Sequence, residues 1–158
     1  MFAAPFLCLA VIRRYRTGMS TLPSYDEITE TFALLDDWED RYRYLIDLGK
    51  TLPPLPEAWR TAENKVQGCA SQVWLKSGID QGRMTFAGDS DAHIVKGLVA
   101  LMIALNSNKT PAEVLDTDAL AIFRTFGLDA HLSPQRSNGL RSMVERMRAD
   151  ARRALEAA

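Results

Sequence analysis

The spacing of apolar and polar residues predicts helices in the first third of the chain. A capping-box pattern, S-x-x-E at residues 24–27, predicts a helix over residues 25–35. A second helix is expected to begin after one of the aspartates at 36–37, because an apolar face repeats at helical spacing beyond them. Gly49 follows that face and is expected to end the helix.

The period changes in the middle of the chain and predicts a β-hairpin. Three prolines within 52–64 exclude regular helix or strand there, so an ordered loop is expected. Residues 71–77 and 83–87 alternate apolar with polar positions, and the Asp-Gln-Gly sequence at 80–82 suits a turn. The residues expected to face inward are Val73, Leu75, Met84 and Phe86, with Trp74 on the opposite face. A lone hairpin is unstable, so a third strand or a helical cover is expected as well.

Helical patterns return after residues 88–91, which are expected to end the sheet and cap the next helix. The segment 91–105 is apolar around most of its circumference and predicts a central buried helix. A capping box at 110–113, a short pattern over 120–126 and a Ser-Pro start at 133–134 predict three further helices. The expected fold class is α+β, with a small antiparallel sheet of about three strands covered by helices.

Length, charge and cysteine content narrow the class of protein. The 158 residues suit one domain, which we assign to residues 20–158. A net charge of −1 gives no electrostatic attraction to nucleic acid or to an anionic membrane. Two cysteines cannot form a disulfide framework, which favours a reducing compartment such as the cytoplasm. The possible zinc ligands are Cys8, Cys69, His93 and His131, whose spacing matches no zinc site, and no metal or cofactor is expected.

The first 19 residues do not share the pattern of the remainder. Their apolar run precedes the arginines, which is the reverse of a secretory signal, and it is too short to span a bilayer. We interpret 1–19 as a poorly anchored leader that arises from an upstream start codon, with Met19 as the working start. A transit peptide is the alternative, because the segment carries arginines and no acidic residue.

Cys69 is the candidate for chemistry within the patterned region. It lies where a loop meets a strand, and Gly68 before it allows a backbone conformation that a side chain would forbid. Ser71 and Gln72 after it are small or amide-bearing, which suits approach by another molecule. These features predict an accessible thiol without strong activation. The alternative is an ordinary buried cysteine that acts as a small apolar residue.

A nucleophilic hydrolase would need a histidine near this thiol. His93 and His131 are the two histidines of the chain, and either one could act as the base if the fold brings it to Cys69. No oxyanion-binding motif accompanies them. Each histidine has a structural or surface role as its alternative.

Two charged residues are further candidates for a binding role. Arg136 is expected at the third position of the last helix, where the helix dipole disfavours a cation, so it is a candidate for contacting a partner or an anion. The alternative is an arginine that extends into solvent. Asp91 is expected in the first turn of the buried helix, where a carboxylate favours the dipole.

Three blocks of the sequence resemble a known family. They are NKVQGCASQVWL at 64–75, GDSDAHIVKGLVAL at 88–101 and HLSPQRSNGLRSM at 131–143. Together they resemble the SufE family of Fe–S metabolism associated proteins, over about residues 24–153. The resemblance implies the fold shared by SufE and IscU-type proteins.

The resemblance also implies a function. It indicates a sulfur-acceptor protein in which Cys69 takes persulfide sulfur from a pyridoxal-phosphate cysteine desulfurase of SufS or CsdA type. The sulfur would then pass to SufB of the SufBCD scaffold for Fe–S cluster assembly, and the pyridoxal phosphate would belong to the partner. The residues implied to support the loop or to dock the partner are Gly68, Ser71, Gln72, Asp91 and Arg136.

Two other roles compete within the same resemblance. An IscU-type scaffold would assemble the cluster directly, but ligation normally takes several thiolates and the domain has only Cys69. A non-covalent adaptor that only activates the desulfurase remains an alternative. The sequence leaves open whether the protein is a monomer or a homodimer.

Overall fold

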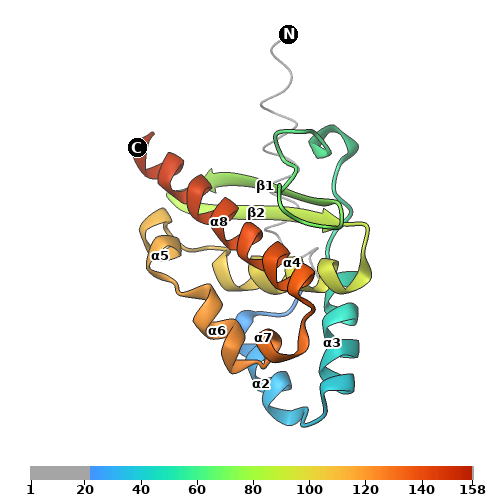
Figure 1. Ribbon diagram of the computed structural model, residues 1–158. Helices are drawn as coiled ribbons and strands as arrows, with labels where there is room; N and C mark the ends of the chain where they lie inside the picture. The colour runs from blue at the N-terminus through green and yellow to red at the C-terminus, as the bar shows by residue number, and fades with distance from the viewer. Residues whose placement is uncertain (1–21, 158) are drawn as a thin grey trace.

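The structure is a computed structural model that describes residues 22–157. The elements, in chain order, are α2 (Tyr25–Leu34), α3 (Trp38–Lys50), the 3-10 turn η1 (Glu57–Trp59), β1 (Val73–Asp80), β2 (Arg83–Ser90), α4 (His93–Asn106), α5 (Pro111–Asp116), α6 (Ala119–Thr125), α7 (Leu128–His131) and α8 (Pro134–Glu156). Figure 1 shows α4 beneath the hairpin, α8 crossing in front, and α2, α3, α6 and α7 on the side away from the strands. This arrangement confirms the α+β fold class.

The sheet of the described residues has two strands rather than about three. β1 and β2 pair antiparallel from Val73 opposite Ser90 to Asp80 opposite Arg83. In place of a third strand, residues 64–66 make a single bridge to the start of β1. This segment does not extend further upstream because the chain turns there, with the Asn64 and Lys65 N–H groups both donating to the Thr61 oxygen.

The two predicted capping boxes and the predicted central helix are confirmed. Ser24 and Glu27 form a capping box at α2, and Thr110 forms one with its partner at α5. α4 is buried along most of its length and packs against α3, β2 and α8. The inward face of α8 consists of the apolar residues predicted for it, Leu140, Met143, Val144, Met147 and Ala151.

Gly49 does not end its helix as predicted. α3 continues to Lys50, and Gly49 instead faces Gly97 of α4. A Cβ at Gly49 would lie 2.7 Å from the Gly97 nitrogen, and one at Gly97 would lie 2.1 Å from the Leu45 oxygen. The two glycines therefore permit a backbone approach that any side chain would prevent.

The expected break after residue 87 is also wrong, because β2 extends to Ser90. Gly88 is packed against Leu75 and Val99, and a Cβ there would lie within 3 Å of both side chains. α4 then begins at His93 with Ala92 as a cap that offers no side-chain hydrogen bond. Asp91 consequently precedes the helix and is not in its first turn.

The short helices after α5 differ from the prediction by one added turn. α6 spans Ala119–Thr125, and Gly127 follows it with a φ of 76°, as a left-handed helix stop requires. α7 then adds one turn, Leu128–His131, that the sequence pattern did not indicate. It delivers the chain to the Ser133 cap of α8.

The proposed leader, residues 1–19 with Cys8, lies outside the described residues. Within residues 22–157, no helix combines the length and the apolar character that crossing a membrane requires.

Candidate functional site

Cys69 sits in a six-residue loop, 67–72, whose base is closed by hydrogen bonds. The Val66 N–H donates to the Val73 oxygen at 2.8 Å, and the Leu75 N–H donates to the Asn64 oxygen at 2.8 Å. The loop therefore projects from a paired base, and the hydrogen bonds that close this base involve none of the residues 67–72.

The glycine before the cysteine has the special conformation predicted for it. Gly68 has a φ of +86°, in the left-handed region that L-residues with side chains rarely adopt. A Cβ built at Gly68 would lie 2.6 Å from the Ser142 Oγ of α8. Both the turn and the close approach to α8 thus depend on glycine at this position.

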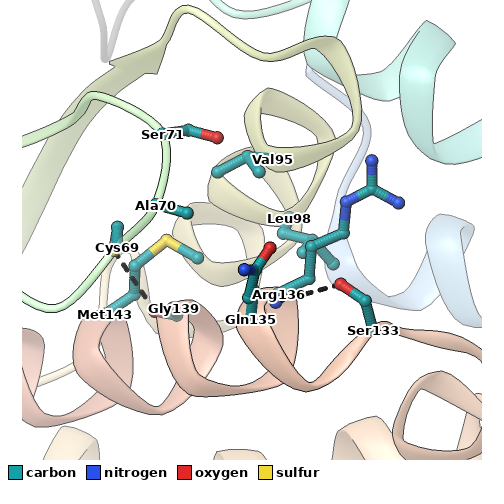
Figure 2. Close-up of a pocket in the computed structure, with 10 residues that line it drawn as sticks. All are labelled: Cys69, Ala70, Ser71, Val95, Leu98, Ser133, Gln135, Arg136, Gly139 and Met143. Atoms are coloured by element: carbon teal, nitrogen blue, oxygen red, sulfur yellow. Dashed lines mark hydrogen bonds between the residues drawn. The ribbon is translucent and has the colours of Figure 1, made fainter.

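The thiol of Cys69 is directed toward α8 and is less accessible than the sequence suggested. Its Sγ lies 3.7 Å from the Gly139 carbonyl oxygen, to which the thiol donates a weak hydrogen bond (Figure 2). Cys69 is half-buried, and this burial raises the pKa of its thiol. At neutral pH the side chain is therefore held as the thiol rather than as the reactive thiolate.

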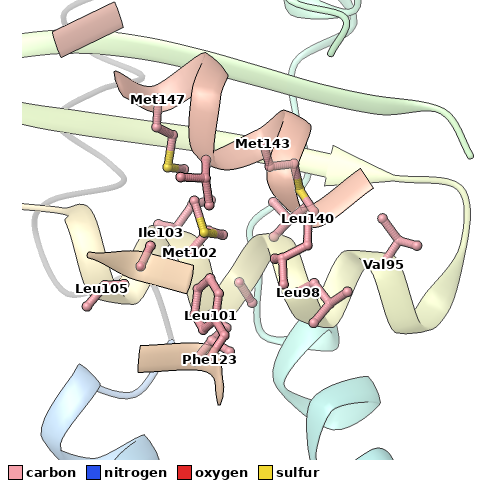
Figure 3. Close-up of a cluster of buried hydrophobic side chains, with 14 of the residues drawn as sticks. Val95, Leu98, Leu101, Met102, Ile103, Leu105, Phe123, Leu140, Met143 and Met147 are labelled. Atoms are coloured by element: carbon pink, nitrogen blue, oxygen red, sulfur yellow. The ribbon is translucent and has the colours of Figure 1, made fainter. Parts of the chain in front are cut away.

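A cavity of about 330 Å³ opens beside this thiol. Its lining residues come from the loop, from α4 and from the first half of α8: Cys69, Ala70, Ser71, Val95, Leu98, Ser133, Gln135, Arg136, Gly139 and Met143. Val95, Leu98 and Met143 are also part of the buried core, so its apolar side is a fixed surface (Figure 3). Apart from the loop, the walls of the cavity come from α4 and α8, and the hairpin contributes none of its residues.

Asp91 and Gln72 fix the far end of the Cys69 loop. The Asp91 Oδ1 accepts a hydrogen bond from the Gln72 N–H at 3.0 Å, and the Asp91 N–H donates to the Gln72 oxygen at 3.3 Å. Asp91 therefore holds the backbone of Gln72 with both its side-chain carboxylate and its own N–H.

Arg136 occupies the third position of α8, as predicted. Its backbone N–H donates to the Ser133 Oγ at 3.3 Å. Its side chain is exposed and lines the cavity, and Figure 2 shows the guanidinium directed away from Cys69. This geometry places a cation at the mouth of the cavity, where it can meet an approaching molecule.

Neither histidine lines the cavity that holds Cys69. His131 stacks on Trp38 with ring centroids 4.3 Å apart and an angle of 12° between the planes. His93 is exposed at the first position of α4. The hydrolase interpretation gains no support from this arrangement.

A buried charge cluster beside the loop was missed by the sequence patterns. Asp89 pairs with Arg60 and with Lys96, and the Arg60 guanidinium lies 4.8 Å from the Trp74 ring centroid. Burial of the Asp89 carboxyl by itself would raise its pKa, but the hydrogen bonds from Arg60 and the Ser90 N–H, with the charge of Lys96, outweigh burial and lower it. The cluster links the loop that precedes β1, through Arg60, to β2, through Asp89, and to α4, through Lys96.

The contacts that Ser142 and Gly139 make with the Cys69 loop also emerge only in the structure, although both residues lie in the third resembling block, 131–143. Both lie on α8, more than 65 positions from the loop that they touch, so no local pattern connects them to Cys69. A glycine in the middle of an otherwise regular helix is the one signal that could have marked Gly139.

Within residues 22–157, fold and site together define a small α+β domain with one thiol, that of Cys69, beside an open cavity. No group of three or more potential metal ligands occurs within the described part of the chain. The family model named SufE, Fe-S metabolism associated domain, matches residues 26–151. The chain belongs to the SufE family, which associates it with Fe–S metabolism as a helper protein rather than a classical enzyme.

Individual relatives agree with this assignment. A SufE-like protein of Rhizobium meliloti (strain 1021) is 55% identical over 134 residues, which cover 82% of this chain and 96% of that protein. A SufE-like protein of Rhizobium etli is 57% identical over 135 residues, covering 83% of this chain and 91% of the relative. The solution structure of a hypothetical protein from Thermus thermophilus matches with a TM-score of 0.69 and 23% identity, over 84% of this chain and 96% of that one. This last likeness supports the fold alone.

Proposed function

We propose that the protein carries sulfane sulfur on Cys69 between a cysteine desulfurase and an Fe–S cluster scaffold. The observation that carries the proposal is the Cys69 Sγ, half-buried beside a cavity of about 330 Å³ on a loop with a closed base. Membership of the SufE family supports a cysteine desulfurase, of SufS or CsdA type, as the donor. SufB of the SufBCD scaffold is the proposed acceptor, and the cytoplasm is the proposed compartment.

The transfer is a thiol exchange that balances without an external oxidant. The Cys69 thiolate attacks the outer sulfur of the persulfide on the desulfurase, and a new S–S bond forms at Cys69. The bond between the two desulfurase sulfurs breaks, and its electron pair returns the enzyme cysteine to a thiolate. The proton lost by Cys69 is available to that thiolate.

The proposed cycle has a resting state, which the structure resembles, and a reacting state. With the thiol against Gly139, its raised pKa suppresses attack on other electrophiles. The reaction requires the loop to turn Cys69 outward, where a base of the desulfurase can take the proton. On return, the added sulfur lies in the cavity between Val95, Leu98 and Met143, sheltered from oxidation.

The residues around the loop also have roles in this scheme. Gly68 and the Asp91–Gln72 hydrogen bonds set the resting position of the loop. Ser71 and Arg136 lie on the cavity lining that a docked partner would meet. Arg136 supplies the positive charge there, at a place where its own helix dipole does not stabilise it.

The deciding experiment is the intact mass of the protein after incubation with a SufS-type desulfurase, pyridoxal phosphate and L-cysteine, without reductant. The expected result is a gain of one sulfur atom that maps to Cys69 and is absent from Cys69→Ser. Unchanged mass with stimulated desulfurase turnover would instead make the protein a non-covalent adaptor. Full stimulation by Cys69→Ser would lead to the same conclusion.

A further inference from the structure

One face of α8 follows the chain that leads into Cys69. Gly139 accepts the weak hydrogen bond from the Cys69 thiol, and Ser142 lies against Gly68, one residue earlier. Arg146 comes one turn further along the same face, because positions three and four apart on a helix are neighbours. Its contact lies earlier in the chain again, on the upstream side of the loop base, residues 64–66. Helix and chain therefore pass each other in opposite directions, with about one contact per turn of α8.

The side chain of Arg146 reaches the backbone of this upstream base. Its Nη1 donates to the Lys65 oxygen at 3.5 Å, and its Nε donates to the two oxygens of Asp150 at 3.2 and 3.3 Å. The bonds use different nitrogens of one planar guanidinium, so a single side chain holds a carbonyl and a carboxylate at a fixed separation. The Arg146 side chain is only 20% exposed, so these bonds are largely withdrawn from water.

Asp150 is itself held in place, which makes the arginine a rigid link. Its side chain is 6% exposed and accepts hydrogen bonds from Ser77 of β1 and from Arg153 of α8, in addition to Arg146. A buried carboxylate is stable only with partners of this kind. The Nε of Arg146 is therefore tied to a point that both β1 and α8 hold, and its Nη1 extends from there to the loop base.

The backbone bonds of the loop base act in a different direction. The bonds from Val66 to Val73 and from Leu75 to Asn64 lie in the sheet, so they fix the two sides of the base to each other. They do not fix the distance of the base from α8. The hydrogen bond from Arg146 runs from the helix to the base and does set that distance.

We propose that Arg146 is a positioning residue for Cys69: through the Lys65 carbonyl it holds the loop base against α8, so that the loop brings its thiol to Gly139 and the cavity. Arg146 is not among the described residues that line the cavity, so it acts on the thiol through the backbone of the loop. Without its bonds the base can move away from α8, and Gly68 and Cys69 then lose their contacts with the helix. The meaning of this role for sulfur transfer rests on the proposed function.

The test is the pH dependence of Cys69 alkylation by iodoacetamide in the full chain, followed on the Cys69 peptide by mass spectrometry because the chain also contains Cys8. Arg146→Met keeps the aliphatic part of the side chain and removes the bonds. Arg146→Lys keeps the charge, but one ammonium cannot take both places of the fork. Both variants are expected to react about threefold or more faster than wild type at neutral pH, with an alkylation midpoint at lower pH, because Cys69 is released from burial.

The direction of the shift separates positioning from charge. Loss of the Arg146 cation by itself would disfavour a thiolate and would move the midpoint of Arg146→Met to higher pH. Arg136 is the charged side chain of the cavity lining, and it is the same in all variants.

Arg148→Met is the matched control on the same helix. Arg148 also donates from its Nη1 to a backbone carbonyl, that of Leu115 in α5, at 2.7 Å. Its loss should lower the free energy of unfolding in a urea titration about as much as the loss of Arg146, since each change removes a charged donor from a carbonyl. The alkylation midpoint of Arg148→Met is nevertheless expected to stay at the wild-type value.

A midpoint that stays at the wild-type value in either Arg146 variant, or that moves to higher pH, would overturn the proposal. An equal shift in Arg148→Met would do so too, because any loosening of α8 would then expose the thiol. The alkylation needs no desulfurase, so its result does not depend on whether Cys69 carries sulfur. Wild-type protein that gains no sulfur from a desulfurase would refute the proposed function and leave the positioning result standing.

Discussion

The Cys69 Sγ lies 3.7 Å from the carbonyl oxygen of Gly139, where the loop meets the first half of α8. A Cβ built at Gly139 would lie 3.5 Å from the same sulfur, at ordinary contact distance. The resting protein can therefore hold alanine at this position. The missing side chain matters only when an additional atom is attached to the thiol.

Gly139→Ala should accordingly separate stability from sulfur loading. Alanine in a helix interior is favoured over glycine by about 0.5–1 kcal/mol, so the free energy of unfolding should be unchanged or slightly higher. An added sulfur would meet the new methyl group, at an overpacking cost of about 1–3 kcal/mol. Denaturant titration and persulfide yield measure the two effects. Asn138→Ala, on the exposed neighbour, is the control and should leave loading at the wild-type level.

Gly68→Ala should destabilise the loop itself. Its φ of +86° costs a residue with a Cβ about 1–2 kcal/mol, and that Cβ would lie 2.6 Å from the Ser142 Oγ. The expected result is a lower free energy of unfolding together with faster alkylation of Cys69. Adding Ser142→Ala to this variant should recover the stability that is lost through the contact with the Ser142 Oγ. The stability that is lost through the left-handed backbone conformation should not return. No recovery in the double variant would mean that the contact with α8 adds nothing.

Asp91→Ala should loosen the Cys69 loop while the hairpin stays intact. The change leaves the Gln72 N–H without its 3.0 Å acceptor, at a cost of about 0.5–1.5 kcal/mol for one hydrogen bond. Hydrogen exchange at Gln72 and alkylation of Cys69 should both become several-fold faster. Asp91→Asn keeps an acceptor oxygen and is the matched control. Equal rates in the two variants would show that Asp91 acts through its charge.

The pKa of Cys69 should be visible in the pH dependence of its alkylation. Burial raises this pKa, so the rate of reaction with iodoacetamide should rise at higher pH in the native protein than in urea. The same shift makes the contribution of Cys69 to the free energy of unfolding depend on pH. That contribution is present in full below the pKa of the thiol in the unfolded chain, and it is lost as the pH rises through the pKa in the folded protein. Cys69→Ser should therefore lack that alkaline loss.

Asp89→Asn should remove a contribution with the opposite pH dependence. The folded pKa of Asp89 is lowered, so its contribution is complete above the ordinary carboxyl pKa and is lost as the pH falls through the folded value. At neutral pH the variant leaves Arg60 and Lys96 without their common anion, at an expected cost of about 1–3 kcal/mol. Urea titrations at neutral and acid pH should show the difference from wild type shrinking as the pH falls. A constant difference would assign the loss to packing.

Local signals determined how much of the fold could be predicted. Capping boxes such as Ser24 with Glu27, and the apolar segment that became α4, act within a few residues and were confirmed. Gly49 was misassigned because the reason for a glycine there is the backbone of Gly97, which the local pattern does not contain. Similarly, β2 continues through Asp89 because Arg60 and Lys96 neutralise a carboxylate that would otherwise oppose burial.

The candidate site shows the same division. The conformation of Gly68 and the position of Arg136 follow from neighbouring residues, and both predictions agree with the structure. The cavity beside Cys69 could not be predicted from neighbouring residues, because half of its wall comes from α8, more than 60 residues further along the chain. The burial that raises the thiol pKa is likewise a property of the assembled fold.

The closed base of the Cys69 loop has a consequence for the speed of the proposed sulfur transfer. Because Val66 and Val73 already hold the two ends together, turning the thiol outward moves six residues and leaves the sheet in place. Loop motions of this size take about nanoseconds to microseconds, whereas thiol exchange between proteins is far slower. We therefore expect loop opening to stay at equilibrium during turnover, so that the loop sets the fraction of thiol available and the bond exchange sets the rate.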